Sequence, residues 1–165
     1  QTMTGPDWAE VFYEGPVRPA VPEDLDALAL LDGLCFNDPW GTRGIQEELL
    51  MQETEDFPRV MLYEDAGGKK AYLIGHLLLD EVRIYRIGVR PEERGKGLAY
   101  HLFSTYLRRA REKGAVLCTL EARESNTPAL KLYKGMGFTK VGYRPHFYQD
   151  TDEGAVLLDL ELNHL

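Results

Sequence analysis

The spacing of apolar residues in the first third of the chain predicts one strand and two helices. Residues 17–21 are an apolar segment of strand length, and residues 22–36 place apolar side chains at helical spacing behind acidic residues in the first turn. The cluster NDPWG at residues 37–41 predicts a turn. Thr42 then fits the N-cap of a second helix that ends near Leu50.

The middle of the chain predicts three strands in succession. Residues 59–65 and 71–80 are apolar segments separated by the turn sequence AGGKK. The second segment is apolar almost throughout, as expected for a central strand that is covered on both faces. Residues 81–89 follow closely, so we expect them to pair with it antiparallel. Gly88, inside this third strand, predicts a bulge or a close approach by a ligand.

The last part of the chain predicts two more helices and three strands. One long helix has an apolar stripe that consists of Leu98, Leu102, Phe103, Tyr106, Leu107 and Ala110. Residues 115–122 predict a strand. Thr127 as N-cap and Pro128 at the first helical position predict a short helix that ends near Gly137. The remaining residues predict two strands that pair as a hairpin.

These elements predict a single mixed α/β (α+β) domain. Their order, β-α-α-β-β-β-α-β-α-β-β, is typical of a mixed sheet with helices on its faces. The chain has 165 residues, which suits one domain. Residues 1–15 show no clear periodicity, so we expect an N-terminal extension there and the domain itself over residues 16–165.

Composition limits the classes of partner. A formal net charge of −8 argues against general nucleic-acid binding. No apolar segment approaches the roughly 18 residues that a membrane span needs. Cys35 and Cys118 lie among apolar residues, so we expect two buried thiols in a reducing cytoplasm. No metal is expected, because none of the histidines has ligand spacing: His76, His101, His146 and His164.

The sequence RGKGLA, from Arg94 to Ala99, lies between a predicted strand and the long helix. One interpretation is an ordinary surface turn. The other is an anion site, in which Gly95, Gly97 and Ala99 let a phosphate approach the free amides of the helix start. The loop matches neither a Walker motif nor a dinucleotide fingerprint. Taken alone, it leaves the two interpretations about equal.

A second segment, TLEARESNTPALKLYKGMGF, places an acid on a strand and a phenol on the following helix. Glu121 alternates with Cys118, Leu120 and Ala122, so it faces away from that apolar set. Tyr133 lies twelve residues later on the short helix. Each of the two has an ordinary interpretation, as a solvated strand residue or a core aromatic. Together they are suited to flank one reaction centre.

The two segments together resemble the GNAT family of N-acetyltransferases. The motif Arg94-x-x-Gly97-x-Ala99 after a strand resembles the family's pyrophosphate loop, and ESNTPALKLYKGMGF resembles its second signature. The resemblance extends over residues 17–162. It implies the GNAT acyl-CoA N-acyltransferase fold, with about seven mostly antiparallel strands and flanking helices, and acetyl-CoA as cofactor.

A narrower resemblance is to the ribosomal-protein alanine N-acetyltransferases (RimI-like). LEAR around Glu121, the turn FNDPW and the ending HFYQDTDEGAVLLDLEL are similar to that group. Three departures are the residue Ala99 where Gly is usual, Phe147-Tyr148 for Tyr-Tyr, and Glu153-Gly154-Ala155 for Asp-Ala. They affect the predicted substrate more than the predicted chemistry.

The resemblance and the residues together predict a set of functional residues. Glu121 is the expected general base for the substrate amine, and Tyr133 the expected general acid for the leaving thiolate. Pro39, Trp40 and Tyr148 are expected to contact the substrate. The cofactor is expected to contact Ile87, Gly88, Val89, Arg94, Gly95, Lys96, Gly97, Leu98, Ala99, Tyr100 and Asn126.

Three functions compete at this point. The first is acetylation of a protein N-terminus, on a ribosomal protein with a small first residue, by a monomer or weak dimer. The second is acetylation of a small amine or amino acid by the same fold. The third is a sensor that binds acyl-CoA without catalysis, which Glu121 and Tyr133 argue against. Trp40 and Tyr148, as walls of a peptide cleft, favour the first over the second, although each also fits an ordinary packing role.

Overall fold

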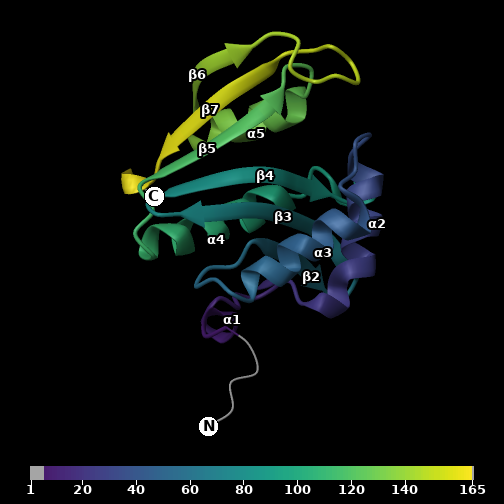
Figure 1. Cartoon of the computed structure of the whole chain (residues 1–165), viewed down its shortest axis with the longest axis vertical. Coiled ribbons are helices and arrows are strands. Elements are labelled where there is room, and N and C mark those ends of the chain that lie inside the picture. The colour runs from purple at the N-terminus through teal and green to yellow at the C-terminus, as the bar shows by residue number, and fades with distance from the viewer. Residues whose placement is uncertain (1–5, 165) are drawn as a thin grey trace.

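The computed structural model describes residues 6–164, in which seven strands form one mixed sheet in the order β1-β2-β3-β4-β5-β7-β6 (Figure 1). The strands are β1 (Val17–Pro19), β2 (Val60–Asp65), β3 (Gly68–Leu78), β4 (Glu81–Val89), β5 (Leu117–Arg123), β6 (Thr139–Arg144) and β7 (Ala155–Glu161). Every neighbouring pair is antiparallel except β4 and β5, which run parallel. The predicted sheet, the pairing of its third and fourth strands and the final hairpin are confirmed.

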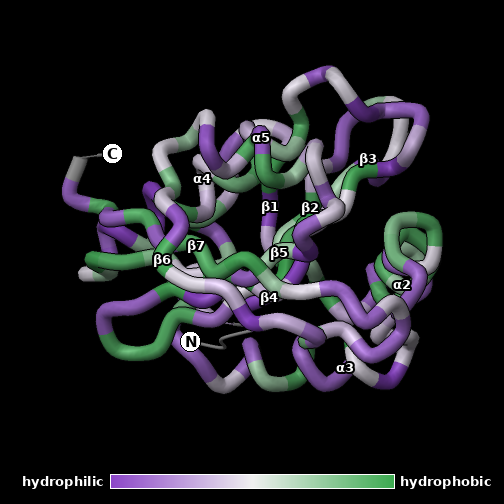
Figure 2. The backbone as a smooth tube through the Cα atoms, turned by 90° about the horizontal axis from the view of Figure 1, so that it is seen from above, coloured by the Kyte–Doolittle hydropathy of each residue, from purple (hydrophilic) through white to green (hydrophobic). Residues whose placement is uncertain are grey.

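Helices cover both faces of this sheet (Figures 1 and 2). The helices are α1 (Trp8–Val11), α2 (Leu25–Cys35), α3 (Gly41–Gln52), α4 (Leu98–Glu112) and α5 (Thr127–Met136). Helices α2 and α3 pack with one buried cluster, and α4 and α5 with another on the opposite face. Helix α3 begins at Gly41 with Trp40 as its N-cap, so the predicted Thr42 cap is wrong.

Strand β3 lies between the two clusters, as its apolar sequence predicts. Tyr72 and Ile74 pack with α2 and α3, whereas Ala71 and Leu73 pack with α4. Because neighbouring residues of a strand face opposite sides, a strand covered on both faces has no place for an alternating polar residue.

Strand β4 is irregular, but its bulge is not at Gly88. Ile74 pairs with Arg86 and Gly75 with Ile84, so Tyr85 is the extra residue. Gly88 has a different role, because a Cβ there would lie 2.5 Å from the ring of Tyr72. The close approach predicted for Gly88 is therefore made by a protein side chain.

Strands β4 and β5 pair over only four residues, from Glu81↔Leu117 to Ile84↔Leu120. Beyond Leu120 the two strands diverge, and Figure 1 shows them separating toward the C-terminal end of β4. The divergence leaves unpaired backbone in the middle of the sheet.

Helix α5 begins at Thr127, one residue before the predicted start at Pro128, and has a different cap. The side chain of Asn126, rather than that of Thr127, accepts a hydrogen bond from the amide of Ala129 at 3.3 Å. Pro128 occupies the first turn, and Gly137 ends the helix with φ of 102°. The predicted end of the helix is confirmed, and its predicted cap is wrong by one residue.

The described part of the N-terminal extension, residues 6–15, packs against the rest of the molecule. Trp8, in α1, and Phe12 are buried, and the ring of Phe12 meets that of Phe57 at a centroid distance of 5.3 Å. The indole of Trp8 donates a hydrogen bond to the carbonyl of Glu55 at 2.9 Å. A segment this short shows no hydrophobic periodicity in its sequence, because only two of its side chains reach the core.

Replacing Trp8 by Phe should lower the free energy of unfolding by about 1–2 kcal/mol, because the carbonyl of Glu55 loses its buried donor. The measurement is urea denaturation. Tyr13→Phe is the matched control, since Tyr13 is exposed and should change stability little. Equal stabilities of the two variants would show that α1 adds nothing to the folded domain.

Candidate active site

Two cavities open where β4 and β5 diverge. One, of ≈ 490 Å³, extends from β5 toward the α2–α3 loop (residues 36–40) and the β6–β7 loop (residues 145–154). The other, of ≈ 580 Å³, extends along the end of β4 to the start of α4. We call them the substrate cavity and the cofactor cavity. Six residues line both, namely Cys35, Phe36, Ile87, Asn126, Ala129 and Tyr133.

The cofactor cavity contains all but one of the residues that were predicted to contact the cofactor. Ten line it, namely Ile87, Gly88, Val89, Arg94, Gly95, Gly97, Leu98, Ala99, Tyr100 and Asn126. Lys96 does not, and its ammonium pairs instead with the carboxylate of Glu93 at 3.2 Å. Glu93 itself lines the cavity and also holds Lys70 at 3.4 Å.

The loop before α4 has the geometry of an anion site. Gly95 and Gly97 have φ of 79° and 81°, values that favour glycine, and a Cβ on either would meet no atom within 4 Å. The first hydrogen bond of α4 runs from His101 N to Gly97 O, so the amides ahead of His101 have no acceptor in the helix. Free amides, the positive end of a 15-residue helix and open space fit the pyrophosphate of a nucleotide-type cofactor.

The open edge of β4 adds backbone groups to this cavity. Arg90 N bonds to Lys70 O on the β3 side. Because the hydrogen-bonding direction alternates along a strand, the backbone groups of Ile87 and Val89 point away from β3, toward the divergence. The carbonyl of Val89 is occupied by Arg94 Nε at 3.0 Å and Cys35 Sγ at 3.3 Å. Gly88 instead belongs to the β3–β4 ladder.

Cys35 is only half-buried and lines both cavities, whereas Cys118 is fully buried. The prediction of two buried thiols is therefore wrong for Cys35. Burial still raises the pKa of both thiols, which keeps them protonated at neutral pH.

Glu121 projects into the substrate cavity, on the strand face that the sequence predicts. Its neighbours Leu120 and Ala122 are buried on the opposite face. Arg83, on β4, donates a hydrogen bond to Oε1 of Glu121 at 2.8 Å. Within residues 6–164 no hydrogen bond involves the other carboxylate oxygen, so this oxygen is available to an amine.

Tyr133 lies at the junction of the two cavities. Its ring packs edge-to-face against Phe103 at a centroid distance of 6.1 Å and lies tilted against Phe138 at 5.7 Å. Burial raises its pKa well above the usual value of about 10. The hydroxyl is therefore protonated throughout the neutral range, and the same burial makes it a weaker acid than a solvated tyrosine.

The two loops that flank the substrate cavity include only part of the predicted substrate set. Tyr148 lines the cavity. Pro39 and Trp40 do not: Pro39 is exposed, and Trp40 packs against Tyr85 at a centroid distance of 6.2 Å. Phe36, Asn37 and Asp38, from the same turn, line the cavity instead. Contacts of Pro39, Trp40 and Tyr148 with a substrate stay a prediction.

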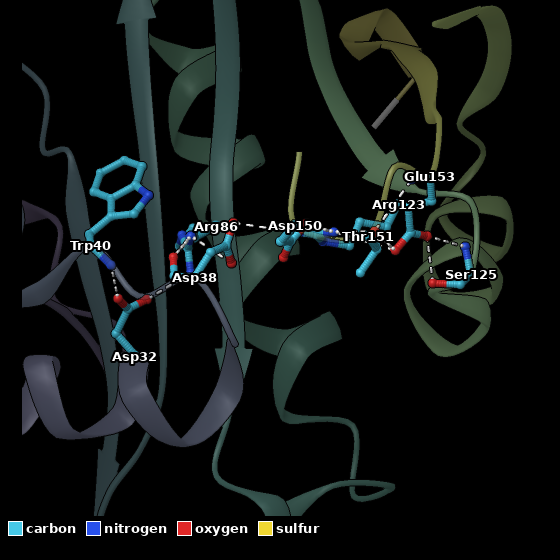
Figure 3. Close-up of polar contacts among 9 residues, drawn as sticks. All are labelled: Asp32, Asp38, Trp40, Arg86, Arg123, Ser125, Asp150, Thr151 and Glu153. Carbon is cyan, nitrogen blue, oxygen red and sulfur yellow. Dashed lines mark hydrogen bonds and ion pairs between the residues drawn. The ribbon is translucent and has the colours of Figure 1, made fainter. Parts of the chain in front are cut away.

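Sequence reasoning also missed the arginines of this site. Arg86 is buried and donates a hydrogen bond to the fully buried Asp32 at 3.1 Å and another to the carbonyl of Asp38 at 2.6 Å (Figure 3). Asp32 also accepts from the amide of Trp40 at 2.6 Å and from the hydroxyl of Tyr72. One available signal was the alternation of β4, in which Arg86 falls in the same row as the apolar residues Val82 and Ile84.

Membrane-spanning helices and metal-ligand clusters are both absent from the described residues. No helix among them is long and apolar enough to cross a membrane. No group of three or more His, Cys, Asp and Glu side chains in residues 6–164 is placed to hold a metal ion.

The fold and the paired cavities define an acyl-CoA-dependent acyltransferase. A model of the acetyltransferase (GNAT) family matches residues 25–138, and the chain belongs to this family. It is an N-acetyltransferase that uses acetyl-CoA.

Its relatives agree with this assignment. The [ribosomal protein bS18]-alanine N-acetyltransferase of Escherichia coli (strain K12) is 30% identical over 142 residues, which are 85% of this chain and 93% of the relative. The crystal structure of the ribosomal-protein-S18-alanine N-acetyltransferase from Escherichia coli superposes with a TM-score of 0.79 at 23% identity, covering 88% of this chain and 92% of that one. A chain of the NatC complex bound to Gag peptide and CoA superposes with a TM-score of 0.76 at 18% identity, covering 88% of this chain and 96% of that one.

The substitution Gly97→Glu should weaken acetyl-CoA binding at least about tenfold, because a carboxylate at the helix start repels phosphate. The measurement is calorimetric titration with acetyl-CoA. Gly97→Asn is the matched control, since asparagine tolerates the φ of 81° and adds no charge. An unchanged affinity in a folded Glu variant would place the pyrophosphate elsewhere.

Proposed function

We propose that this protein acetylates the α-amine of a protein N-terminus, on a ribosomal protein that begins with a small residue. The observation that carries the proposal is the meeting of the two cavities at Tyr133, with Glu121 in one and the glycine loop in the other. The proposal also draws on the relative from Escherichia coli, whose name states that it acetylates alanine of ribosomal protein bS18. A cytoplasmic monomer or weak dimer is the form we propose.

Glu121 is the proposed general base. A peptide α-amine has a pKa of about 7.7–8.0 and is largely protonated at neutral pH, so it must lose a proton before it can react. The carboxylate oxygen that Arg83 leaves free accepts this proton, directly or through a water molecule. Arg83 fixes the other oxygen and so limits the orientations of the carboxylate.

Tyr133 is the proposed general acid, which gives its proton to the leaving thiolate of CoA. When bound, acetyl-CoA supplies an acetyl group activated as a thioester. The chain's own residues position the reactants: the amides before His101 bind phosphate, the backbone of Ile87 faces the divergence, and Tyr133 holds a proton at the junction of the cavities. Positioning of this kind supplies much of the rate in two-substrate reactions.

A small-molecule amine is the competing substrate. The peptide is favoured by the extent of the substrate cavity, which continues past Glu121 to residues of both flanking loops. A small amine needs only the part next to Glu121. Tyr148 and Asp38 lie beyond that part and are suited to contact a longer substrate.

The experiment compares three acceptors with acetyl-CoA: a peptide with a free N-terminal alanine, the same peptide blocked at its N-terminus but carrying an internal lysine, and a small amine. The free N-terminus should react fastest, because a lysine amine has a pKa near 10.4 and is harder to deprotonate. Faster reaction of the blocked peptide would show that the enzyme acetylates lysine side chains in preference to N-termini. Faster reaction of the small amine would support the competing function.

A further inference from the structure

Arg123 lies on the same face of β5 as Glu121, two residues further along the strand. Two strand residues cover about 7 Å, so the arginine leaves β5 close to the proposed base. Its guanidinium contacts both flanking loops. It donates to Asp38 of the α2–α3 loop at 3.2 Å and to the two carboxylate oxygens of Asp150, in the β6–β7 loop, at 2.8 and 3.0 Å (Figure 3).

We call Arg123, Asp38, Asp150 and Glu153 the Arg123 cluster. Glu153 completes it, 3.3 Å from the guanidinium. The ring of Tyr148 stacks on the same guanidinium, 4.0 Å from its central carbon. An arginine that is held by three carboxylates and an aromatic ring has few alternative conformations.

Both ends of the Arg123 cluster are anchored in the rest of the protein. On one side, Arg86 holds Asp38 by its carbonyl at 2.6 Å and by its carboxylate at 3.3 Å, and is itself paired with the buried Asp32. On the other side, Glu153 accepts from the amide and the hydroxyl of Ser125, at 3.1 and 2.6 Å. Figure 3 shows these contacts as one continuous series from Asp32 to Ser125.

Few side-chain hydrogen bonds cross the divergence of β4 and β5 within residues 6–164. Arg83 makes them at the paired end, to Thr119 and Glu121. At the open end, the contact between Arg123 and Asp38 is the one that joins the α2–α3 loop to the β5–β7 half. This ion pair therefore links the two flanking loops directly.

We propose that Arg123 is a positioning residue for the peptide substrate, which holds the two flanking loops at the separation that an extended peptide requires. This inference rests on the proposed function, because it concerns substrate residues behind the reacting amine. The distance from Glu121 to Arg123 corresponds to about two residues of extended chain. A substrate that ends before that point does not reach the Arg123 cluster.

The test compares two acceptors that differ in length: an alanine-initiated hexapeptide and alanine amide, each at saturating acetyl-CoA. With Arg123→Gln, kcat/KM for the hexapeptide should fall about tenfold, mainly through KM, because the flanking loops are misplaced. With the same variant, kcat/KM for alanine amide should change less than about twofold. A general loss of folding would lower both values together.

Three further variants sharpen the result. Asp38→Asn removes the charge that pairs with Arg123 across the cavity and with Arg86, but keeps the hydrogen bond from Arg86 to the carbonyl of residue 38. The loss on the hexapeptide should therefore be smaller than that of Arg123→Gln, about two- to fivefold, as expected for half-exposed ion pairs. Arg123→Lys keeps the charge but lacks the planar guanidinium that contacts several carboxylates at once, and should show the same selective loss. Arg111→Gln, on an exposed residue of α4 outside both cavities, is the matched control and should change kcat/KM for neither acceptor.

The outcomes separate the two proposals. A parent enzyme that acetylates alanine amide but not the hexapeptide would overturn both the proposed function and the role of Arg123. If the parent is active on the hexapeptide, and the folded Arg123 variants lose kcat/KM equally for both acceptors or for neither, the role of Arg123 alone is overturned. A loss confined to the hexapeptide supports it.

Discussion

Replacement of Tyr133 by Phe is expected to lower turnover about 10²-fold while the affinity for acetyl-CoA stays the same. The side chain keeps its packing against Phe103 and Phe138, because the rings are the same size. Only the proton at the junction of the cavities is lost. Single-turnover kinetics with a reactive peptide measure the change in turnover, and calorimetric titration measures the affinity for acetyl-CoA.

Tyr106→Phe is the control for this prediction. Tyr106 is also a buried tyrosine, and its hydroxyl donates to the carbonyl of Pro58 at 2.8 Å, outside both cavities. Its loss should cost about 1 kcal/mol of stability and leave turnover unchanged. If Tyr133→Phe behaves like this control, Tyr133 is a packing residue, as the alternative interpretation of the sequence held.

Glu121→Gln should also lower turnover by about 10²-fold at neutral pH, and raising the pH should restore part of it. The amide keeps the shape of the side chain and can still accept a hydrogen bond from Arg83, but it cannot accept a proton. Above the amine pKa of about 8, most of the substrate is already deprotonated, so the missing base matters less. The measurement is a pH–rate profile with a free N-terminal peptide.

Glu81→Gln serves as the control, because it makes the same charge change at the exposed start of β4. It should match the parent at every pH. A Glu121→Gln profile parallel to that of the parent, with no recovery at high pH, would show that this carboxylate positions the substrate without removing its proton.

Local patterns predicted most of this structure, and contacts between distant segments account for what they missed. Alternation in β5 predicted the direction of Glu121, because two neighbouring apolar residues are enough to define a strand face. Glycine spacing predicted the loop before α4, since positive φ and open space are local requirements. The side-chain partners of these residues, such as Arg83 for Glu121, come from other strands and leave no periodic signal.

The positions of some aromatic residues also depend on contacts between distant segments. Trp40 and Phe36 are both aromatic residues of one turn, and only the packing of Trp40 on Tyr85 decides which of them faces the cavity. Trp8 is too isolated in sequence for any period to reveal that it is buried. The role proposed here for Arg123 depends on carboxylates from two loops that are far apart in sequence, Asp38 in one and Asp150 and Glu153 in the other.

The four-residue pairing of β4 with β5 has a consequence for the chemistry. A slip of one residue in this pairing would turn every side chain of β5 to the opposite face of the sheet. The carboxylate of Glu121 would then point into the apolar cluster, and Ala122 would take its place in the cavity. Cys118 and Leu120, both buried on the core face, oppose that slip. The burial of Cys118 and Leu120 in the apolar cluster therefore helps to determine on which face of the sheet the carboxylate emerges.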